Sequence, residues 1–180
     1  MSSFALDRLL RPKSIAVVGA SPEPGSVSGL LLANLQRFGY AGQLHLVSRS
    51  RDEVNGIRCF KSIDELPEGV DVAVLVVPQV AVADSVAACG RRGVGAAVVF
   101  ASGFAEMGEE GRAAQEAMAA IAQRHGVAVL GPNCLGFINF ADAVPLTFEP
   151  VQPASVRTGP RIGIVAQSGA MNGNLRQAFL

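Results

Sequence analysis

Five short segments of the chain are apolar at nearly every position. A strand with one face in water alternates apolar and polar residues, whereas a strand covered on both faces is apolar throughout. Segments of the second kind are typical of a parallel sheet that has helices on both sides. They are Ile15–Val18, Leu44–Val47, Val70–Val77, Ala96–Ala101 and Val127–Leu130.

Helical patterns lie between most of these predicted strands. Val80–Arg92 places apolar residues on one face and ends before Gly93, and Glu109–His125 ends at Gly126. Glycines there suit the left-handed caps that terminate helices. The alternation predicts a Rossmann-like, doubly wound α/β domain with a parallel sheet. Shorter elements are expected between the second and third strands: an extended piece at Val54–Phe60 and a turn of helix at Ser62–Leu66.

The first strand runs into a loop of small residues that leads to a helix. Gly19 ends the strand, and Ser26 starts an amphipathic segment whose periodic part is Leu30–Phe38. This order turns backbone N–H groups and the positive end of a helix dipole toward the loop, which favours a phosphate. The loop glycines stand farther apart than in a dinucleotide fingerprint. The loop predicts a nucleotide-like ligand, and a strand–helix turn without a ligand is the alternative.

Charge and composition argue against several classes of partner. The chain has 15 basic and 15 acidic residues, no Trp and one Tyr, so it offers neither a basic face nor a base-stacking surface for nucleic acid. No apolar run is long enough to span a membrane, and the N-terminus lacks the features of a signal peptide. Cys59, Cys89 and Cys134 match neither a disulfide framework nor a zinc site, which indicates a reducing cytoplasm and no metal.

Four prolines interrupt a stretch in which the periodicity fades, and a second strand–helix pattern follows it. Arg161–Ala166 predicts a strand, Gln167–Gly169 a turn and Ala170–Leu180 a helix. One strand and one helix cannot form a core, so they are interpreted as the first βα unit of an incomplete second domain. The predicted divisions are a first domain over residues 1–138, a linker over 139–160 and the start of the second domain over 161–180.

Four reactive side chains have a simpler structural interpretation. His45 lies among apolar residues of a strand, and His125 lies in the last turn of a helix, where a cation suits the dipole. Cys134 lacks an evident base to activate it as a nucleophile. Ser168 imitates a nucleophile elbow, but no Asp or His follows it, so phosphate binding at a helix start is preferred.

Three acidic residues follow the fourth predicted strand. Glu109 and Glu110 stand in the first turn of a helix, where carboxylates are ordinary partners of the dipole. They are interpreted as structural. Glu106 lies in the preceding loop, and its role stays open.

Six motifs in a fixed order carry a family resemblance. They are RPKSIAVVGAS at Arg11–Ser21, PGSV at Pro24–Val27, VVP at Val76–Pro78, SGFAE at Ser102–Glu106, GPNCLG at Gly131–Gly136 and QSGA at Gln167–Ala170. The chain resembles, nearly end to end, the acyl-CoA synthetases that form a nucleoside diphosphate, such as ADP-forming acetate–CoA ligase. More distantly, it is similar to the α subunit of succinyl-CoA synthetase.

The resemblance implies a CoA-binding Rossmann-like domain followed by a flavodoxin-like domain. The loop after the first strand would hold the CoA phosphates, and the ends of two neighbouring strands would line the pantetheine path. Asn133 would supply a polar group near the thiol end. Ser168 and Gly169 would steady a phosphohistidine at a helix start. The implied cofactor-binding residues of the loop and the two strand ends are Gly19, Ala20, Ser21, Gly25, Ser26, Val27, Val77, Pro78, Ala101, Ser102 and Gly103.

The chain departs from the family pattern at two places. Relatives commonly have Asn-Pro-Lys after the second strand, where the lysine meets the adenosine phosphate, whereas this chain has Ser48, Arg49, Ser50 and Arg51. Ser48, Arg49 and Arg51 are therefore counted among the predicted cofactor-binding residues, and Arg49 or Arg51 could replace the lysine, because a guanidinium suits phosphate. In addition, the phosphorylated histidine of the second domain has no counterpart here. We therefore expect this chain not to complete a ligase cycle by itself.

The sequence leaves three functions open. The first is the CoA-binding portion of an acid–CoA ligase that forms ADP or another nucleoside diphosphate, with the remainder of the ligase as its partner. On this interpretation ATP, ADP and Mg²⁺ belong to the parent enzyme and do not bind this chain. The second is an NADP-linked oxidoreductase domain, with Arg49 on the 2′-phosphate. The third is a non-catalytic CoA-binding module. A homo-oligomer is possible in each case.

Overall fold

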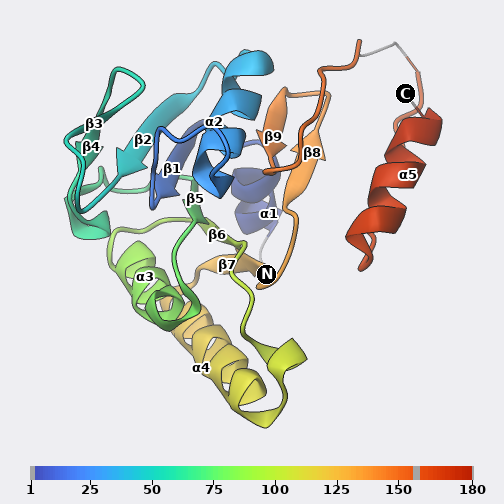
Figure 1. Ribbon diagram of the computed structural model, residues 1–180. Helices are drawn as coiled ribbons and strands as arrows, with labels where there is room; N and C mark the ends of the chain where they lie inside the picture. Colours follow the sequence, from blue (N-terminus) through green and yellow to red (C-terminus); the bar gives the residue numbers. More distant parts are fainter. Residues whose placement is uncertain (1–2, 156–158, 180) are drawn as a thin grey trace.

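The computed structural model describes residues 3–155 and 159–179 (Figure 1). A seven-stranded sheet in the order β3-β4-β2-β1-β5-β6-β7 forms its centre, and only β3 runs antiparallel to its neighbour. The parallel sheet predicted from the apolar segments is therefore confirmed. The strands are β1 (Ser14–Val18), β2 (Gln43–Val47), β3 (Glu53–Val54), β4 (Ile57–Phe60), β5 (Val72–Leu75), β6 (Ala96–Val99) and β7 (Ala128–Leu130).

Helices cover both faces of this sheet, as the absence of alternation predicted (Figure 1). One apolar cluster joins the sheet to α3 and α4, and the other joins it to α1 and α2. Each residue of β5 and β6 is buried, because both faces of these strands are covered. The helices are α1 (Ser3–Leu10), α2 (Val27–Arg37), α3 (Gln79–Arg91) and α4 (Glu109–His125), with short 3₁₀ turns η1 (Ile63–Glu65) and η2 (Ala105–Met107).

The segment predicted as one extended piece, Val54–Phe60, is instead a hairpin. Asn55 and Gly56 have φ values of 52° and 79°, which is the backbone geometry of a two-residue hairpin turn. The turn separates β3 from β4, and β4 pairs in parallel with β2. The hairpin thereby extends the sheet beyond β2.

Part of the predicted linker packs against the first domain. Strands β8 (Phe137–Asn139) and β9 (Val144–Leu146) form a second, two-stranded sheet. Val144 and Leu146 are buried on the α2 side of the main sheet. The Asn34 side-chain amide on α2 donates to the carbonyl oxygens of Thr147 and Glu149, each at 2.8 Å. The prolines in this stretch therefore accompany an ordered hairpin.

The strand predicted at 161–166 is absent. Those residues form no ladder, because no neighbouring strand lies beside them to share hydrogen bonds. The helix predicted after them is confirmed as α5 (Gly169–Phe179), which stands beyond the β8–β9 hairpin (Figure 1). Leu180 and residues 1–2 and 156–158 lie outside the described residues. No helix in the described ranges combines the length and apolar character needed to cross a membrane.

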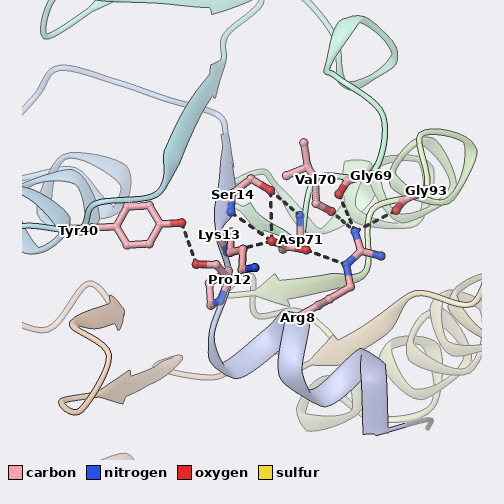
Figure 2. Close-up of polar contacts among 9 residues, drawn as sticks. All are labelled: Arg8, Pro12, Lys13, Ser14, Tyr40, Gly69, Val70, Asp71 and Gly93. Carbon is pink, nitrogen blue, oxygen red and sulfur yellow. Dashed lines mark hydrogen bonds and ion pairs between the residues drawn. The ribbon is translucent and has the colours of Figure 1, made fainter.

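Asp71 ties together the end of the sheet where the parallel strands begin (Figure 2). Its carboxylate accepts hydrogen bonds from the backbone N–H groups of Lys13 and Ser14, at 2.8 and 3.2 Å, and from Arg8 Nε at 2.9 Å. Arg8 also donates to the carbonyl oxygen of Val70 at 2.7 Å. The start of β5 is thus fastened to both α1 and β1.

Tyr40 closes the same end of the sheet from the α2 side. Its hydroxyl donates to the carbonyl oxygen of Pro12 at 3.0 Å (Figure 2). Burial, with a smaller contribution from the Asp71 carboxylate, raises the pKa of Tyr40 to about 12. The hydroxyl consequently keeps its proton at neutral pH and remains a donor.

Replacement of Asp71 tests this fastening. Asp71→Ala leaves two backbone N–H groups without their acceptor and removes the ion pair with Arg8, so we expect a loss of about 2–3 kcal/mol of unfolding free energy. Urea denaturation followed by circular dichroism measures it. Asp84→Ala, at an exposed position of α3, is the control and should change stability by less than about 0.5 kcal/mol. Equal effects of the two substitutions would contradict the assignment.

Candidate functional site

The residues predicted to bind a ligand come from loops that leave the sheet at one edge. Strands β2, β1, β5, β6 and β7 are parallel and in register, so their carboxyl ends lie side by side. Ligands of open α/β sheets bind outside this edge. The topology therefore brings the loops after β1, β2, β5, β6 and β7 together, as the sequence pattern required.

The first half of the loop after β1 is held by the protein itself. The N–H groups of Gly19 and Ala20 both donate to the carbonyl oxygen of Val47, at 2.9 and 3.0 Å. Ser21 N–H donates to the buried hydroxyl of Ser28 at 3.0 Å. These three N–H groups thus have partners within the protein and fix the course of the loop between β1 and β2.

The start of α2 has N–H groups without acceptors. Ser26 is the N-cap: its hydroxyl accepts from Gly29 N–H at 3.0 Å and donates to the carbonyl oxygen of Glu23 at 2.7 Å. Within the described residues, the N–H groups of Gly25, Val27 and Ser28 make no hydrogen bond. Together with the helix dipole they form an arrangement suited to a phosphate. Sequence reasoning missed Ser28, whose position inside the first turn becomes evident only from the observed helix start.

The three glycines of this region differ in how much space surrounds them. Gly19 has a φ of 89°, and a Cβ there would lie 2.0 Å from the carbonyl oxygen of Val76, so only glycine lets β1 leave the sheet beside β5. A Cβ on Gly29 would lie 2.0 Å from the carbonyl oxygen of Glu23. A Cβ on Gly25, in contrast, would meet no atom within 4 Å. The backbone at Gly25 is therefore open to solvent, and its lack of a side chain serves no packing need inside the chain.

The loop after β2 carries two arginines to the same edge. Ser48 is buried, and its N–H donates to the carbonyl oxygen of Phe60 at 2.9 Å. Arg49 is exposed and forms no ion pair with any residue in the described ranges. Arg51 Nη2 lies 3.8 Å from Glu23 Oε1 in the loop after β1. Of the two arginines, Arg51 is thus the one in contact with the predicted phosphate loop.

The loops after β5 and β6 touch one another. Val77 and Pro78 lead directly into α3, and Ala101, Ser102 and Gly103 follow β6. Gly103 has a φ of 101°, and a Cβ there would lie 3.2 Å from Cγ of Gln79, the first residue of α3. The two predicted walls of the pantetheine path are therefore adjacent.

Glu106 has a structural partner in this loop. Its carboxylate accepts a hydrogen bond from Gly103 N–H at 2.6 Å. Hydrogen bonds from backbone N–H groups, those of Glu106 itself and of Gly103 first, lower the pKa of this carboxyl. Glu106 is therefore ionised at neutral pH and stabilises the turn after β6.

The loop after β7 joins the same group of loops. Asn133 has a φ of 52°, is exposed, and donates its N–H to the carbonyl oxygen of Ala101 at 2.9 Å. Cys134 is turned inward, since its thiol lies 3.4 Å from the carbonyl oxygen of Val99. Burial raises the pKa of Cys134, which leaves it protonated and a poor nucleophile. Asn133 is thus at the edge, and Cys134 is structural.

The helix start predicted to bind phosphate in the second domain lies beside the loop after β7. Ser168 caps α5, since its hydroxyl accepts from Met171 N–H at 3.3 Å. A Cβ on Gly169 would lie 2.2 Å from Cδ1 of Leu135. Arg176 Nη1 on α5 lies 3.6 Å from Glu149 Oε2. The start of α5 therefore contacts the loop that carries Asn133.

Neither histidine belongs to the site. His125 is exposed at the end of α4. His45 packs edge-on against Phe60, and its Nε2 is buried without a hydrogen-bond partner in the described part of the chain. That burial lowers the pKa of His45 below its ordinary value of 6.5. Among the described residues, no group of three or more His, Cys, Asp or Glu side chains could hold a metal ion.

Two hollows in the described part of the protein lie away from the predicted ligand-binding loops. A hollow of about 300 Å³ is lined by residues of α2, β2 and the β3–β4 turn, among them Leu35, Leu44 and Asn55. Another, of about 500 Å³, lies at the opposite end of the sheet, beside Lys13 and Gln43. Neither is lined by the predicted ligand-binding residues. A ligand at the carboxyl edge would accordingly lie along the surface of the loops.

Comparison with known proteins assigns the sheet to one family. Residues 13–139 match the model of a family described as a CoA binding domain. The chain is 44% identical to a trans-feruloyl-CoA synthase of an unknown prokaryotic organism, over 99% of this chain and 25% of that protein. It is 36% identical to the α subunit of ADP-forming acetate–CoA ligase I of Pyrococcus furiosus, over 93% of this chain and 36% of that subunit.

Solved structures agree with these sequence matches. A Pyrococcus horikoshii OT3 protein superposes with a TM-score of 0.84 at 32% identity. The superposition covers 96% of this chain and 38% of the Pyrococcus chain. Dinucleotide-forming acetyl-coenzyme A synthetase 1 of Ca. Korarchaeum cryptofilum, in complex with phosphate and ADP, superposes with a TM-score of 0.76 at 37% identity, over 81% of this chain and 31% of that one. The chain thus spans between a quarter and two fifths of these relatives.

The half-buried imidazole of His45, whose Nε2 has no hydrogen-bond partner among the described residues, makes a pH dependence testable. Its lowered pKa means that the unfolded chain takes up a proton that the folded chain resists, so unfolding free energy should fall as the pH drops below about 6.5. His45→Leu should remove this dependence between about pH 7 and pH 5.5, above the range in which carboxylates titrate. Urea denaturation at both values measures it. His125→Gln, the exposed control, should retain the dependence of the unaltered chain, and an unchanged slope in His45→Leu would refute the assignment.

Proposed function

Since the chain belongs to the CoA binding domain family of NDP-forming acyl-CoA synthetases, we propose that it binds coenzyme A along the carboxyl edge of its sheet as the CoA-binding part of an acid–CoA ligase. In the parent reaction a carboxylic acid, CoA and a nucleoside triphosphate would yield acyl-CoA, a nucleoside diphosphate and phosphate. The relatives' names support a ligase of this class.

The start of α2 carries the proposal. Among the described residues, the N–H groups of Gly25, Val27 and Ser28 have no acceptor and lie at the positive end of the helix dipole. Gly25 has no side chain that would stand in the way of a ligand, and the space beside its Cα is open. The family match covers this whole region. A diphosphate bound there would receive hydrogen bonds from the helix start, and Gly19, Ala20 and Ser21 would shape the loop from behind.

The rest of CoA would follow the loops outward from this point. Arg49 and Arg51 supply positive charge beside the loop for the 3′-phosphate. The pantetheine arm would pass the adjacent loops at Val77, Pro78, Ala101, Ser102 and Gly103, with Asn133 near the thiol. The contacts between these loops support one continuous path.

The nucleotide half of the reaction would be completed elsewhere in the parent protein. ATP, ADP and Mg²⁺ are proposed to bind outside this chain, and neither His45 nor His125 is placed to carry phosphate. Ser168 and Gly169, at a helix start beside the Asn133 loop, would steady a phosphohistidine supplied by another part of the ligase. Two Pyrococcus furiosus relatives are α subunits by name, which supports a partner subunit. A cytoplasmic enzyme and a homo-oligomer are consistent with this proposal.

An NADP-binding domain is the alternative that one observation favours. Arg49 is exposed at the end of β2, where an arginine can take the 2′-phosphate of NADP. Calorimetric titration of the chain with CoA and with NADP separates the two functions. Binding of CoA alone supports the proposal, and binding of NADP alone overturns it.

Gly25→Val tests the position of the CoA phosphates. The added side chain has room in the free protein but would block the approach of a diphosphate, so CoA affinity should fall tenfold or more, about 1.4 kcal/mol. Calorimetry gives the affinity, and thermal unfolding checks the fold. Gly163→Val, at another glycine whose Cβ would meet no atom, is the matched control and should leave affinity unchanged. Unaltered binding by a folded Gly25→Val variant would rule out this position.

Dephospho-CoA tests the role of the arginines. If Arg49 or Arg51 contacts the 3′-phosphate, the unaltered chain should bind CoA more tightly than dephospho-CoA, by about tenfold for a charge-assisted contact. The variant with both arginines changed to alanine should bind the two ligands equally. Equal affinity of the unaltered chain for both ligands would remove the arginines from this role.

A further inference from the structure

An ion pair bridges two loops at the mouth of the proposed site. Arg51, after β2, lies 3.8 Å through Nη2 from Oε1 of Glu23, in the loop that leads to α2. A carboxylate is an unexpected neighbour for a site that would bind phosphate, because it repels the ligand and neutralises a cation the ligand needs. Its presence therefore requires an explanation.

The backbone on the Glu23 side is held firmly. The carbonyl oxygen of Glu23 accepts two hydrogen bonds from Ser26, one from its N–H at 3.0 Å and one from its hydroxyl at 2.7 Å. Glu23 N–H donates to the hydroxyl of Ser21 at 3.3 Å. These contacts belong to the cap of α2, so the residue cannot leave without opening the helix start. Only its carboxylate arm, whose side chain is 73% exposed, is free to move.

The backbone on the Arg51 side is braced as well. The carbonyl oxygen of Arg51 accepts a hydrogen bond from Lys61 Nζ at 2.9 Å, and that of Asp52 accepts one from Cys59 N–H at 2.8 Å. The Lys61 ammonium is also paired with the Asp52 carboxylate at 2.7 Å. The Lys61 ammonium therefore already has two acceptors. The backbone of Arg51 is held in place, and only its side chain can change position.

The pair between these two arms is weak enough to be exchanged. Its charges are 3.8 Å apart and the Arg51 side chain is 42% exposed, so water and salt screen the attraction. A phosphate carries more charge than a carboxylate, and it can accept two parallel guanidinium hydrogen bonds, whereas Glu23 meets Arg51 at 3.8 Å, beyond hydrogen-bond distance. A bound phosphate would therefore displace Glu23 from Arg51.

We propose that Glu23 is a positioning residue that holds Arg51 in the free protein and releases it to a phosphate of the bound ligand. This inference depends on the proposed binding of CoA. The ion pair with Glu23 keeps Arg51 close to the site when no ligand is present. Binding of the ligand breaks this pair. Glu23 thus lowers the affinity for ligands that reach Arg51 and favours their release.

A double-mutant cycle on CoA affinity tests the exchange. Glu23→Gln removes the competing charge and keeps the shape, so it should tighten CoA binding about two- to fivefold at low salt, and the gain should shrink in high salt. In the Arg51→Ala background, Glu23→Gln should tighten binding less, because only the direct repulsion between the carboxylate and the ligand is removed and no guanidinium remains to be released. Calorimetry measures all four proteins, and thermal unfolding verifies that each is folded.

A matched control separates the exchange from a general effect of charge. Glu53→Gln removes an exposed carboxylate on β3, two positions from Arg51, and should leave CoA affinity unchanged. The proposal is overturned if Glu23→Gln leaves affinity unchanged or lowers it, if its gain is as large in the Arg51→Ala background as in the unaltered chain, or if its gain equals that of Glu53→Gln. Failure of the unaltered chain to bind CoA would instead overturn the proposed function.

Discussion

The way in which β1 ends controls the rest of the molecule. β1 pairs with β2 on one side and β5 on the other, and its chain must leave the sheet while both neighbours continue to their own loops. Gly19 makes this departure possible, because any side chain there would collide with the carbonyl oxygen of Val76. The carbonyl of Val47 then accepts two successive N–H groups and directs the chain toward α2. The position of the α2 start, and of the site, follows from these contacts.

The two ends of the parallel sheet have opposite roles. At the end where the strands begin, Asp71 pairs with Arg8 and accepts from the backbone of Lys13, and Tyr40 donates to the carbonyl oxygen of Pro12. At the carboxyl edge, three N–H groups of the α2 start have no acceptor and Arg49 has no ion pair in the described ranges. The described side chains thus satisfy the backbone at one end of the sheet, whereas the start of α2 leaves donors without acceptors at the other end. Glu23 limits the attraction at that edge by holding Arg51.

Sequence periodicity predicted the sheet and its double cover well but predicted local hairpins poorly. The central strands are apolar throughout because both faces are buried, which is a property of each residue that a linear pattern records. The β3–β4 and β8–β9 hairpins are short, and their stability comes from pairing with β2 and from packing on α2. Prolines between 145 and 160 suggested a linker, yet Asn34 and Arg37 of α2 bind the carbonyl oxygens of this stretch. Such contacts join residues more than 100 positions apart, so no local pattern announces them.

The sequence by itself determined the class of fold, the strand–loop–helix unit that suits a phosphate and, through six ordered motifs, the family. These depend on composition along the chain and on hydrogen bonding within a single turn, both of which are local. Only the tertiary structure decided which backbone donors are available: the N–H groups of Gly19, Ala20 and Ser21 have acceptors in the folded protein, whereas those of Gly25, Val27 and Ser28 have none among the described residues. The contact between Arg51 and Glu23 is likewise decided only by the tertiary structure, because the distance between two loops depends on how neighbouring strands pair and where each strand ends.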